Sequence, residues 1–105
     1  MADTPESKVK KKVRETLNEL GAYYAMPIGT GFGNSGVPDF LVCLKGKFIG
    51  IECKANGKKP TALQQKHLDD IQKAGGRRLV IDEDNVFLLK EVLIKSTQEK
   101  QSDKA

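Results

Sequence analysis

The chain has 105 residues, of which 38% are hydrophobic and 30% are charged, a composition that fits one globular domain and leaves no room for a second core. Its net charge of +4 and its pI near 9.1 permit a polyanionic partner, although a lysine-rich solvated surface explains both values equally well. The N-terminus is polar and resembles no signal peptide, and the apolar runs are too short to span a membrane. We therefore expect a cytoplasmic, intracellular protein.

A basic amphipathic helix is predicted at the start of the chain. Thr4 is a good N-cap and Pro5 fits the first helical position. An apolar stripe at helical spacing follows and ends before Gly21; it consists of Val9, Val13, Leu17 and Leu20. The remaining faces are crowded with basic residues, namely Lys8, Lys10, Lys11, Lys12 and Arg14. The helix is therefore expected to pack on the domain by one stripe.

Three strands are expected next. Residues 22–28 predict a strand that a proline weakens near its end, and a glycine-rich loop follows over residues 29–36. Residues 37–44 and 47–54 predict two further strands, joined by a tight turn at Lys45-Gly46. These last two strands are expected to form a hairpin.

The second half of the chain predicts a helix and one more strand. Thr61 caps a helix that ends at the Gly75-Gly76 pair, and residues 77–81 predict a fourth strand. Beyond Asp84-Asn85, residues 86–95 suit a last helix, although residues 86–89 could instead form a short strand.

The element order of helix, three strands, helix and strand, with a possible C-terminal helix, predicts an α/β fold. In such a fold a mixed central sheet is flanked by helices. One domain is expected over residues 1–95, and residues 96–105 form a polar tail that we expect to be disordered.

Two cysteines, Cys43 and Cys53, lie inside predicted buried strands. Neither has the spacing of a metal site or of a CxxC motif. We expect both to be reduced core residues.

Strand parity gives the first indication of chemistry. Side chains alternate between the faces of a strand, so Glu52 and Lys54 share one face of the strand over residues 47–54, and Ile49, Ile51 and Cys53 share the other. Asp39 follows Pro38 near the start of the neighbouring strand. The predicted hairpin can therefore bring Asp39 across from Glu52 and Lys54.

Two carboxylates that converge near a lysine suit phosphodiester hydrolysis. Carboxylate oxygens bind a hard cation such as Mg²⁺, which stabilises charge on the phosphate and lowers the pKa of a bound water. A lysine can orient that water or stabilise the transition state. A surface Asp with an ordinary Glu–Lys pair is the plainer alternative, and it explains a bare E-x-K motif easily.

Helix phase brings two more polar residues into consideration. Glu6 projects onto the apolar stripe of the first helix, where an inward charge is costly unless it has a partner such as a metal site. Alternatively, Glu6 complements the helix dipole. Gln64 shares a face with Leu68 and Ile71, and either a capping box with Thr61 or a contact with a metal-bound water or a phosphate explains it.

The run Gly36-Val37-Pro38-Asp39, then Glu52-Cys53-Lys54 and then Gln64 resembles the PD-(D/E)XK nuclease superfamily. More narrowly, it resembles the compact phage and bacterial form of the virus-type replication-repair nuclease (VRR-NUC) family. The resemblance extends over residues 6–86, and it implies a restriction-endonuclease-like core.

The resemblance assigns a role to each motif residue and implies a Mg²⁺ or Mn²⁺ cofactor. Asp39 and Glu52 would bind the metal together with the backbone carbonyl of Cys53, and Lys54 would be the catalytic lysine. Glu6 would complete the site, in part through water, and Gln64 would be the helix glutamine of the family. Cleavage would leave a 5′-phosphate.

Compact members of the family resemble junction-resolving enzymes. The resemblance therefore implies a structure-selective endodeoxyribonuclease of DNA repair, which nicks opposed strands of four-way (Holliday) junctions as a homodimer in a phage or its bacterial host. A flap or nicking nuclease that acts as a monomer or with a partner is one alternative. Another is a non-catalytic DNA-binding module that contacts phosphates through Lys10, Lys58 and Lys59.

Overall fold

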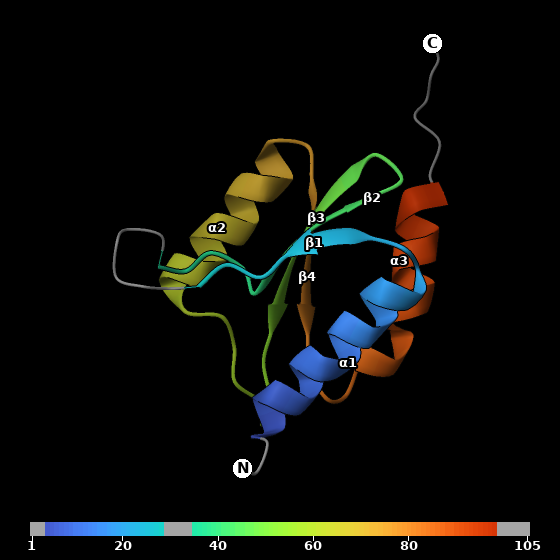
Figure 1. Cartoon of the computed structure of the whole chain (residues 1–105). Coiled ribbons are helices and arrows are strands. Elements are labelled where there is room, and N and C mark those ends of the chain that lie inside the picture. The colour runs from blue at the N-terminus through green and yellow to red at the C-terminus, as the bar shows by residue number, and fades with distance from the viewer. Residues whose placement is uncertain (1–3, 29–34, 99–105) are drawn as a thin grey trace.

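The computed structural model describes residues 4–28 and 35–98. The helices and strands follow the predicted order, with three strands in succession after the first helix (Figure 1). The helices are α1 (Pro5–Glu19), α2 (Ala62–Lys73) and α3 (Leu89–Gln98), with a short 3₁₀ helix η1 (Val86–Leu88) before α3. The strands are β1 (Tyr23–Ala25), β2 (Phe40–Leu44), β3 (Lys47–Cys53) and β4 (Arg77–Ile81).

The strands form one mixed sheet in the order β1-β2-β3-β4. The first two pairings are antiparallel, and β3 pairs with β4 in parallel, so α2 is the crossover between two parallel strands. The β2–β3 turn has positive φ at both central residues, 51° at Lys45 and 81° at Gly46. This backbone is typical of a two-residue hairpin turn, which confirms the predicted hairpin.

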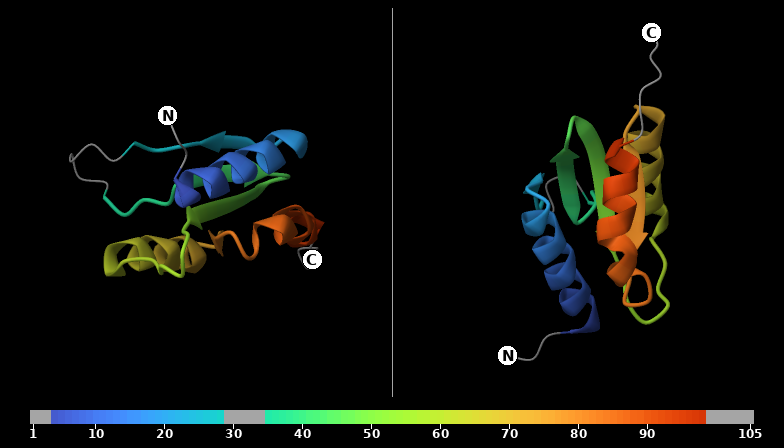
Figure 2. Two further views of the ribbon diagram at one scale, coloured as in Figure 1. Left: turned by 90° about the horizontal axis from the view of Figure 1, so that it is seen from below. Right: turned by 90° about the vertical axis from the view of Figure 1, so that its right-hand side faces the viewer.

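Helices cover both faces of the sheet (Figure 2). α1 and α3 share one face, where they bury the main hydrophobic core. That core contains Val9, Val13, Leu17, Phe40, Val42, Leu44, Ile49, Ile51, Cys53, Ile81, Leu89 and Leu93. α2 packs against β3 and β4 on the opposite face, where a Cβ on Gly50 would lie 2.6 Å from Ile71 Cδ1. Glycine at this position therefore lets α2 approach β3 closely.

Several predicted boundaries need correction. The first strand is shorter than residues 22–28, because only Tyr23–Ala25 pair with β2. The last segment is helical rather than a short strand, and α3 continues through Gln98. The predicted start of a disordered tail at Ser96 is therefore wrong, since Thr97 Oγ1 donates to the carbonyl of Leu93 at 2.8 Å inside that helix. The rest of the predicted tail lies outside the described residues, as does most of the glycine-rich loop.

The two cysteines have different environments. Cys53 is buried as predicted, and both cysteines are free. The prediction that Cys43 is a core residue is wrong, because Cys43 is exposed. Its neighbours Val42 and Leu44 point into the core, so Cys43 lies on the opposite face. It lies in a lateral row between Tyr23 of β1 and Phe48 of β3, which are 77% and 46% exposed.

Within the described residues, no helix combines the length and the apolar character needed to cross a membrane.

We expect Leu17→Ala to lower the free energy of unfolding by about 2–5 kcal/mol, because the substitution leaves a cavity in the core. Leu17 is fully buried between α1 and the sheet. Leu88→Ala is a matched control, since Leu88 is 41% exposed and should lose less than about 1 kcal/mol. Urea unfolding measures both values, and similar losses would contradict the described core.

Candidate active site

Asp39 is fixed to the end of β3 by its side chain. Phe40 pairs with Ile51, so Asp39, one residue before β2, comes beside Glu52. The ladder between β2 and β3 has ended at this point, and Asp39 Oδ2 accepts a hydrogen bond of 2.8 Å from the backbone N–H of Cys53. The carboxylate therefore replaces the strand carbonyl that would otherwise satisfy this amide.

Glu52 is a buried acid, with a relative exposure of 2%. Its Oε2 lies 3.5 Å from Lys54 Nζ, and its Oε1 has no hydrogen-bond partner among the described residues. Burial, and next the charge of Asp39, raise the pKa of Glu52 to about 7, against the opposing effect of Lys54. An acceptor that is both buried and unsatisfied is costly, so this oxygen points to a ligand-binding site.

Lys54 lies on the same side of β3 as Glu52, as strand parity predicted. Its backbone N–H continues the pairing with β4 by donating to the carbonyl of Ile81 at 2.9 Å. Its side chain is only 11% exposed. The lysine, one residue beyond β3, is therefore held close to the acid by the backbone that continues the strand.

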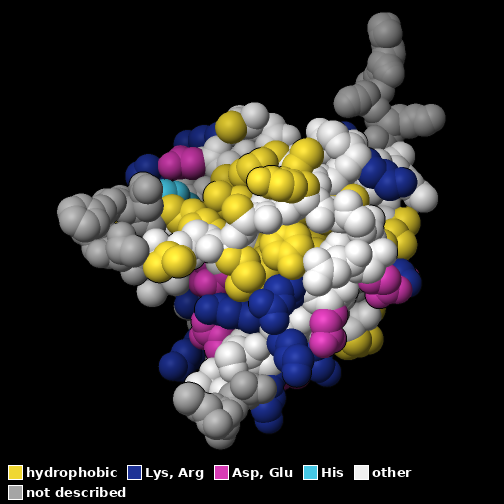
Figure 3. All heavy atoms as spheres, viewed as in Figure 1, with side chains coloured by type: hydrophobic (Ala, Val, Ile, Leu, Met, Phe, Trp, Pro, Cys, Tyr) yellow, Lys and Arg dark blue, Asp and Glu magenta, His cyan; other side chains and the backbone are white. Residues whose placement is uncertain are grey.

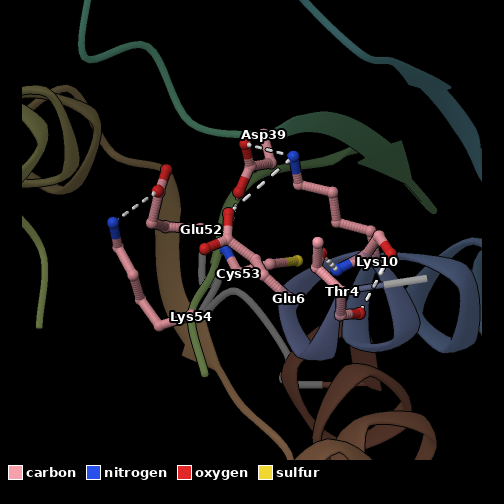
Figure 4. Close-up of polar contacts among 8 residues, drawn as sticks. Thr4, Glu6, Lys10, Asp39, Glu52, Cys53 and Lys54 are labelled. Atoms are coloured by element: carbon pink, nitrogen blue, oxygen red, sulfur yellow. Dashed lines mark hydrogen bonds and ion pairs between the residues drawn. The ribbon is translucent and has the colours of Figure 1, made fainter. Parts of the chain in front are cut away.

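Helix α1 adds an acid and a base from the opposite side (Figure 4). Lys10 Nζ lies 3.6 Å from Asp39 Oδ1 and 3.9 Å from Glu6 Oε2. Glu6 is the weakest of the charges that raise the pKa of Glu52, and it shares the Lys10 ammonium with Asp39. Its side chain is nevertheless 38% exposed, which places it at the mouth of the site.

A pocket of about 320 Å³ opens beside these residues. It lies between the start of α1 and the loop after β3, and it is lined by Thr4, Pro5, Glu6, Ser7, Lys10, Ala55, Asn56 and Lys58. Lys59 is exposed on the same loop. Basic side chains also gather over α1 (Figure 3), where Lys8, Lys11, Lys12 and Arg14 are exposed. This surface suits a polyanion.

Gln64 forms the predicted capping box at the start of α2. Its Oε1 accepts from the backbone N–H of Thr61 at 2.9 Å, and Thr61 Oγ1 accepts from the N–H of Gln64 at 3.2 Å. The cap therefore explains the carbonyl end of this side chain. Only the amide Nε2 remains for a second role.

The donor set suits a hard cation but consists of few side chains. Among residues 4–28 and 35–98, no group of three His, Cys, Asp or Glu side chains is arranged to hold a metal. Asp39 and Glu52 supply two carboxylates, and burial raises the pKa of the Cys53 thiol far above its usual value. The Cys53 carbonyl points to the same edge of β3 as its N–H, toward Asp39. Two carboxylates, one of which has an unsatisfied Oε1, and this carbonyl fit Mg²⁺ or Mn²⁺. Mg²⁺ in particular keeps several of its waters.

The sequence did not reveal the position of Lys10, which we expected only to contact DNA phosphate. The four-residue spacing from Glu6 was a visible signal for an ion pair on the helix. The contact with Asp39 depends on how α1 packs beside β2, and sequence spacing does not give that packing.

A scan of protein-family models finds no match to this chain. The provisionally named nuclease p44 of Acyrthosiphon pisum secondary endosymbiont phage 1 is 42% identical over 78 residues, which cover 73% of this chain and 82% of that protein. A solved structure of a VRR-NUC domain superposes with a TM-score of 0.68 at 28% identity, covering 85% of this chain and 97% of the domain.

The matches cover most of the length of both relatives. The solved domain shares the mixed sheet with flanking helices that was predicted as a restriction-endonuclease-like core. The chain therefore belongs to the VRR-NUC family of nucleases.

Proposed function

We propose that this protein is a metal-dependent endodeoxyribonuclease whose active site is formed by Asp39, Glu52 and Lys54. The observation that carries the proposal is Glu52: a buried acid with an unpaired oxygen, beside a second carboxylate and a lysine. A structural ion pair between Glu52 and Lys54 does not account for Oε1 of Glu52, which stays buried without a partner among the described residues. A divalent cation bound between the two acids would relieve their repulsion.

The metal would be held by Asp39, Glu52 and the backbone carbonyl of Cys53, with Glu6 reaching it directly or through water. When bound, Mg²⁺ or Mn²⁺ stabilises charge on the phosphate and activates water. The hydrogen bond from Cys53 keeps Asp39 oriented. Lys54 directs its ammonium toward the phosphate or the attacking water, where it stabilises developing negative charge. Hydrolysis leaves a 5′-phosphate.

The proposed substrate is branched DNA, with the four-way junction as the first choice, in repair or replication within a phage or its bacterial host. Lys10, Lys58 and Lys59 would contact its phosphates. Each chain supplies one site, so paired nicks in opposed strands require two copies, and a homodimer with twofold symmetry provides them. A flap or nicking nuclease acting as a monomer or with a partner protein is the alternative.

One assay tests the function and the substrate together. The full chain is incubated with Mg²⁺ or Mn²⁺ and with four-way junction, flap and linear duplex DNA, and its solution mass is measured. Symmetric junction nicks by a dimer support the proposal, and flap cleavage by a monomer supports the alternative. Binding without cleavage in either metal would show a DNA-binding module instead.

We expect Asp39→Asn to lower the cleavage rate by on the order of 100-fold or more while DNA binding is retained. The substitution removes a metal-binding charge and leaves the side-chain shape almost unchanged. Asp70→Asn is the matched control, because Asp70 is an exposed residue that pairs with Lys66 on α2. Gel assays of cleavage and binding measure both variants, and full activity of Asp39→Asn would remove Asp39 from the site.

The raised pKa of Glu52 predicts that the metal-free protein loses stability as the pH rises. The pKa changes from 4.5 to about 7 on folding, so between these values the folded state binds more protons than the unfolded state. The contribution is fully present below pH 4.5 and is lost as the pH rises through 7. It amounts to about 3 kcal/mol at most.

Glu52→Gln removes this titration, so it isolates the effect from those of the other carboxylates. We expect the metal-free variant to match the wild type near pH 4.5 and to exceed its free energy of unfolding near pH 8. Urea unfolding at both pH values measures the difference. Added Mg²⁺ should stabilise the wild type and not the variant. A difference that does not change with pH would contradict the raised pKa.

Two substitutions separate the cap from any catalytic role of Gln64. Gln64→Glu keeps the acceptor of the capping box and removes the amide donor. It should retain stability and lose cleavage activity if Nε2 contacts a phosphate or water. Gln64→Ala should lose about 1 kcal/mol of stability as well. Thermal unfolding and cleavage rates measure both, and full activity of Gln64→Glu would reduce Gln64 to a capping residue.

A further inference from the structure

Lys10 has two acidic partners that belong to different elements. Its ammonium lies 3.9 Å from Glu6 on its own helix and 3.6 Å from Asp39, just before β2. Lys54 pairs with Glu52 on the other side of the site. Three acids therefore face two lysines, and Lys10 faces the two acids that Lys54 does not contact (Figure 4).

We propose that Lys10 is a positioning residue that couples metal loading to DNA binding. This inference rests on the proposed metal-dependent function. Without metal, the Lys10 ammonium acts as a tethered cation beside Asp39. When the divalent ion binds Asp39, repulsion moves this ammonium away, and a DNA phosphate becomes its new partner.

The geometry suits a displaceable cation. Both separations exceed a normal hydrogen-bond length, so they are ion pairs without a fixed donor–acceptor bond. The side chain of Lys10 is 36% exposed, and pairs this accessible to water are weak. Lysine is also a point charge on a flexible stem. The ammonium can therefore leave Asp39 without disturbing the core.

The same geometry provides a place for the displaced ammonium. Lys10 lines the pocket of about 320 Å³ together with Lys58, at the mouth of the site. A phosphate in this pocket would meet both lysines. Glu6 lines the pocket too, and its charge opposes a phosphate unless a metal neutralises it. Metal and DNA are therefore expected to favour each other's binding.

An ordinary pair between Lys10 and Glu6 on the helix surface is the simpler explanation. Such pairs form at a spacing of four residues and stabilise a helix slightly. This explanation does not require Asp39, which lies on a different element and is held in place by Cys53. The two explanations differ in what removal of Lys10 does to metal affinity.

Calorimetric titration of Ca²⁺ into the full, DNA-free chain tests the proposal without any cleavage. Ca²⁺ is a suitable probe because it binds carboxylate and carbonyl oxygens. We expect Lys10→Met, and Lys10→Gln as a second variant, to bind Ca²⁺ about two- to fivefold more tightly than the wild type. Lys10→Arg should match the wild type. Lys11→Met is the control, because Lys11 is exposed on the same helix and makes no ion pair among the described residues.

Fluorescence anisotropy with a labelled four-way junction measures the coupling between Ca²⁺ binding and DNA binding. The ratio of DNA affinities with and without Ca²⁺ should be larger in the wild type and Lys11→Met than in Lys10→Met. Linkage makes this ratio equal to the gain in Ca²⁺ affinity caused by DNA. A merely structural role of Lys10 would not change it.

The outcomes separate this proposal from the proposed function. Unchanged or weaker Ca²⁺ binding by Lys10→Met would overturn the role of Lys10 and leave the metal site intact. An equal gain in Lys11→Met would overturn it too, because overall charge would then be the cause. An absence of Ca²⁺ binding in every variant would overturn both the metal site and the coupling.

Discussion

The hydrogen bond from the Cys53 N–H to Asp39 Oδ2 is the interaction on which the rest of the site depends. It lies where the β2–β3 ladder ends, and it uses a side chain to satisfy an amide that strand pairing leaves free. One consequence is mechanical, because Asp39 is held against β3 rather than in solvent. The other is electrostatic, because a second negative charge is fixed near Glu52. Burial and this charge together raise the pKa of Glu52 to about 7.

Such an arrangement is unfavourable for stability alone. Glu52 is buried with one oxygen unsatisfied, and its pKa is raised by burial and by the charge of Asp39, against the opposing effect of Lys54. Residues that destabilise a fold in this way are typical of functional sites. The packing around β3 offsets this loss of stability. β3 is an inner strand of the sheet, with α2 on one face and the main core on the other. The buried acid with an unsatisfied oxygen therefore lies on a strand that is covered on both faces.

The sequence predicted correctly those features that depend on residue spacing within one strand or one helix end. Alternation along β3 separated Glu52 and Lys54 from the core residue Ile51, and the Thr61–Gln64 cap followed from a four-residue pattern. It failed where tertiary packing decides. Cys43 was expected in the core because its strand is apolar, yet it is exposed. The spacing of residues in the sequence does not show which part of a sheet face a helix covers. Helix phase predicted an inward Glu6, but it did not predict that this side chain is 38% exposed.

Helix α1 contributes to the core, to the charges of the candidate site and to the basic surface beside that site. Its apolar stripe, which includes Val13 and Leu17, fixes the helix on the sheet. One turn nearer its start, Lys10 pairs with Glu6 on the same helix and with Asp39 just before β2, while the neighbouring lysines face solvent. Residues four apart share a face of a helix, so Glu6 and Lys10 cannot be moved relative to Asp39 without moving the stripe. The charge balance of the candidate site and the basic surface beside it are thus set by the packing of a single element.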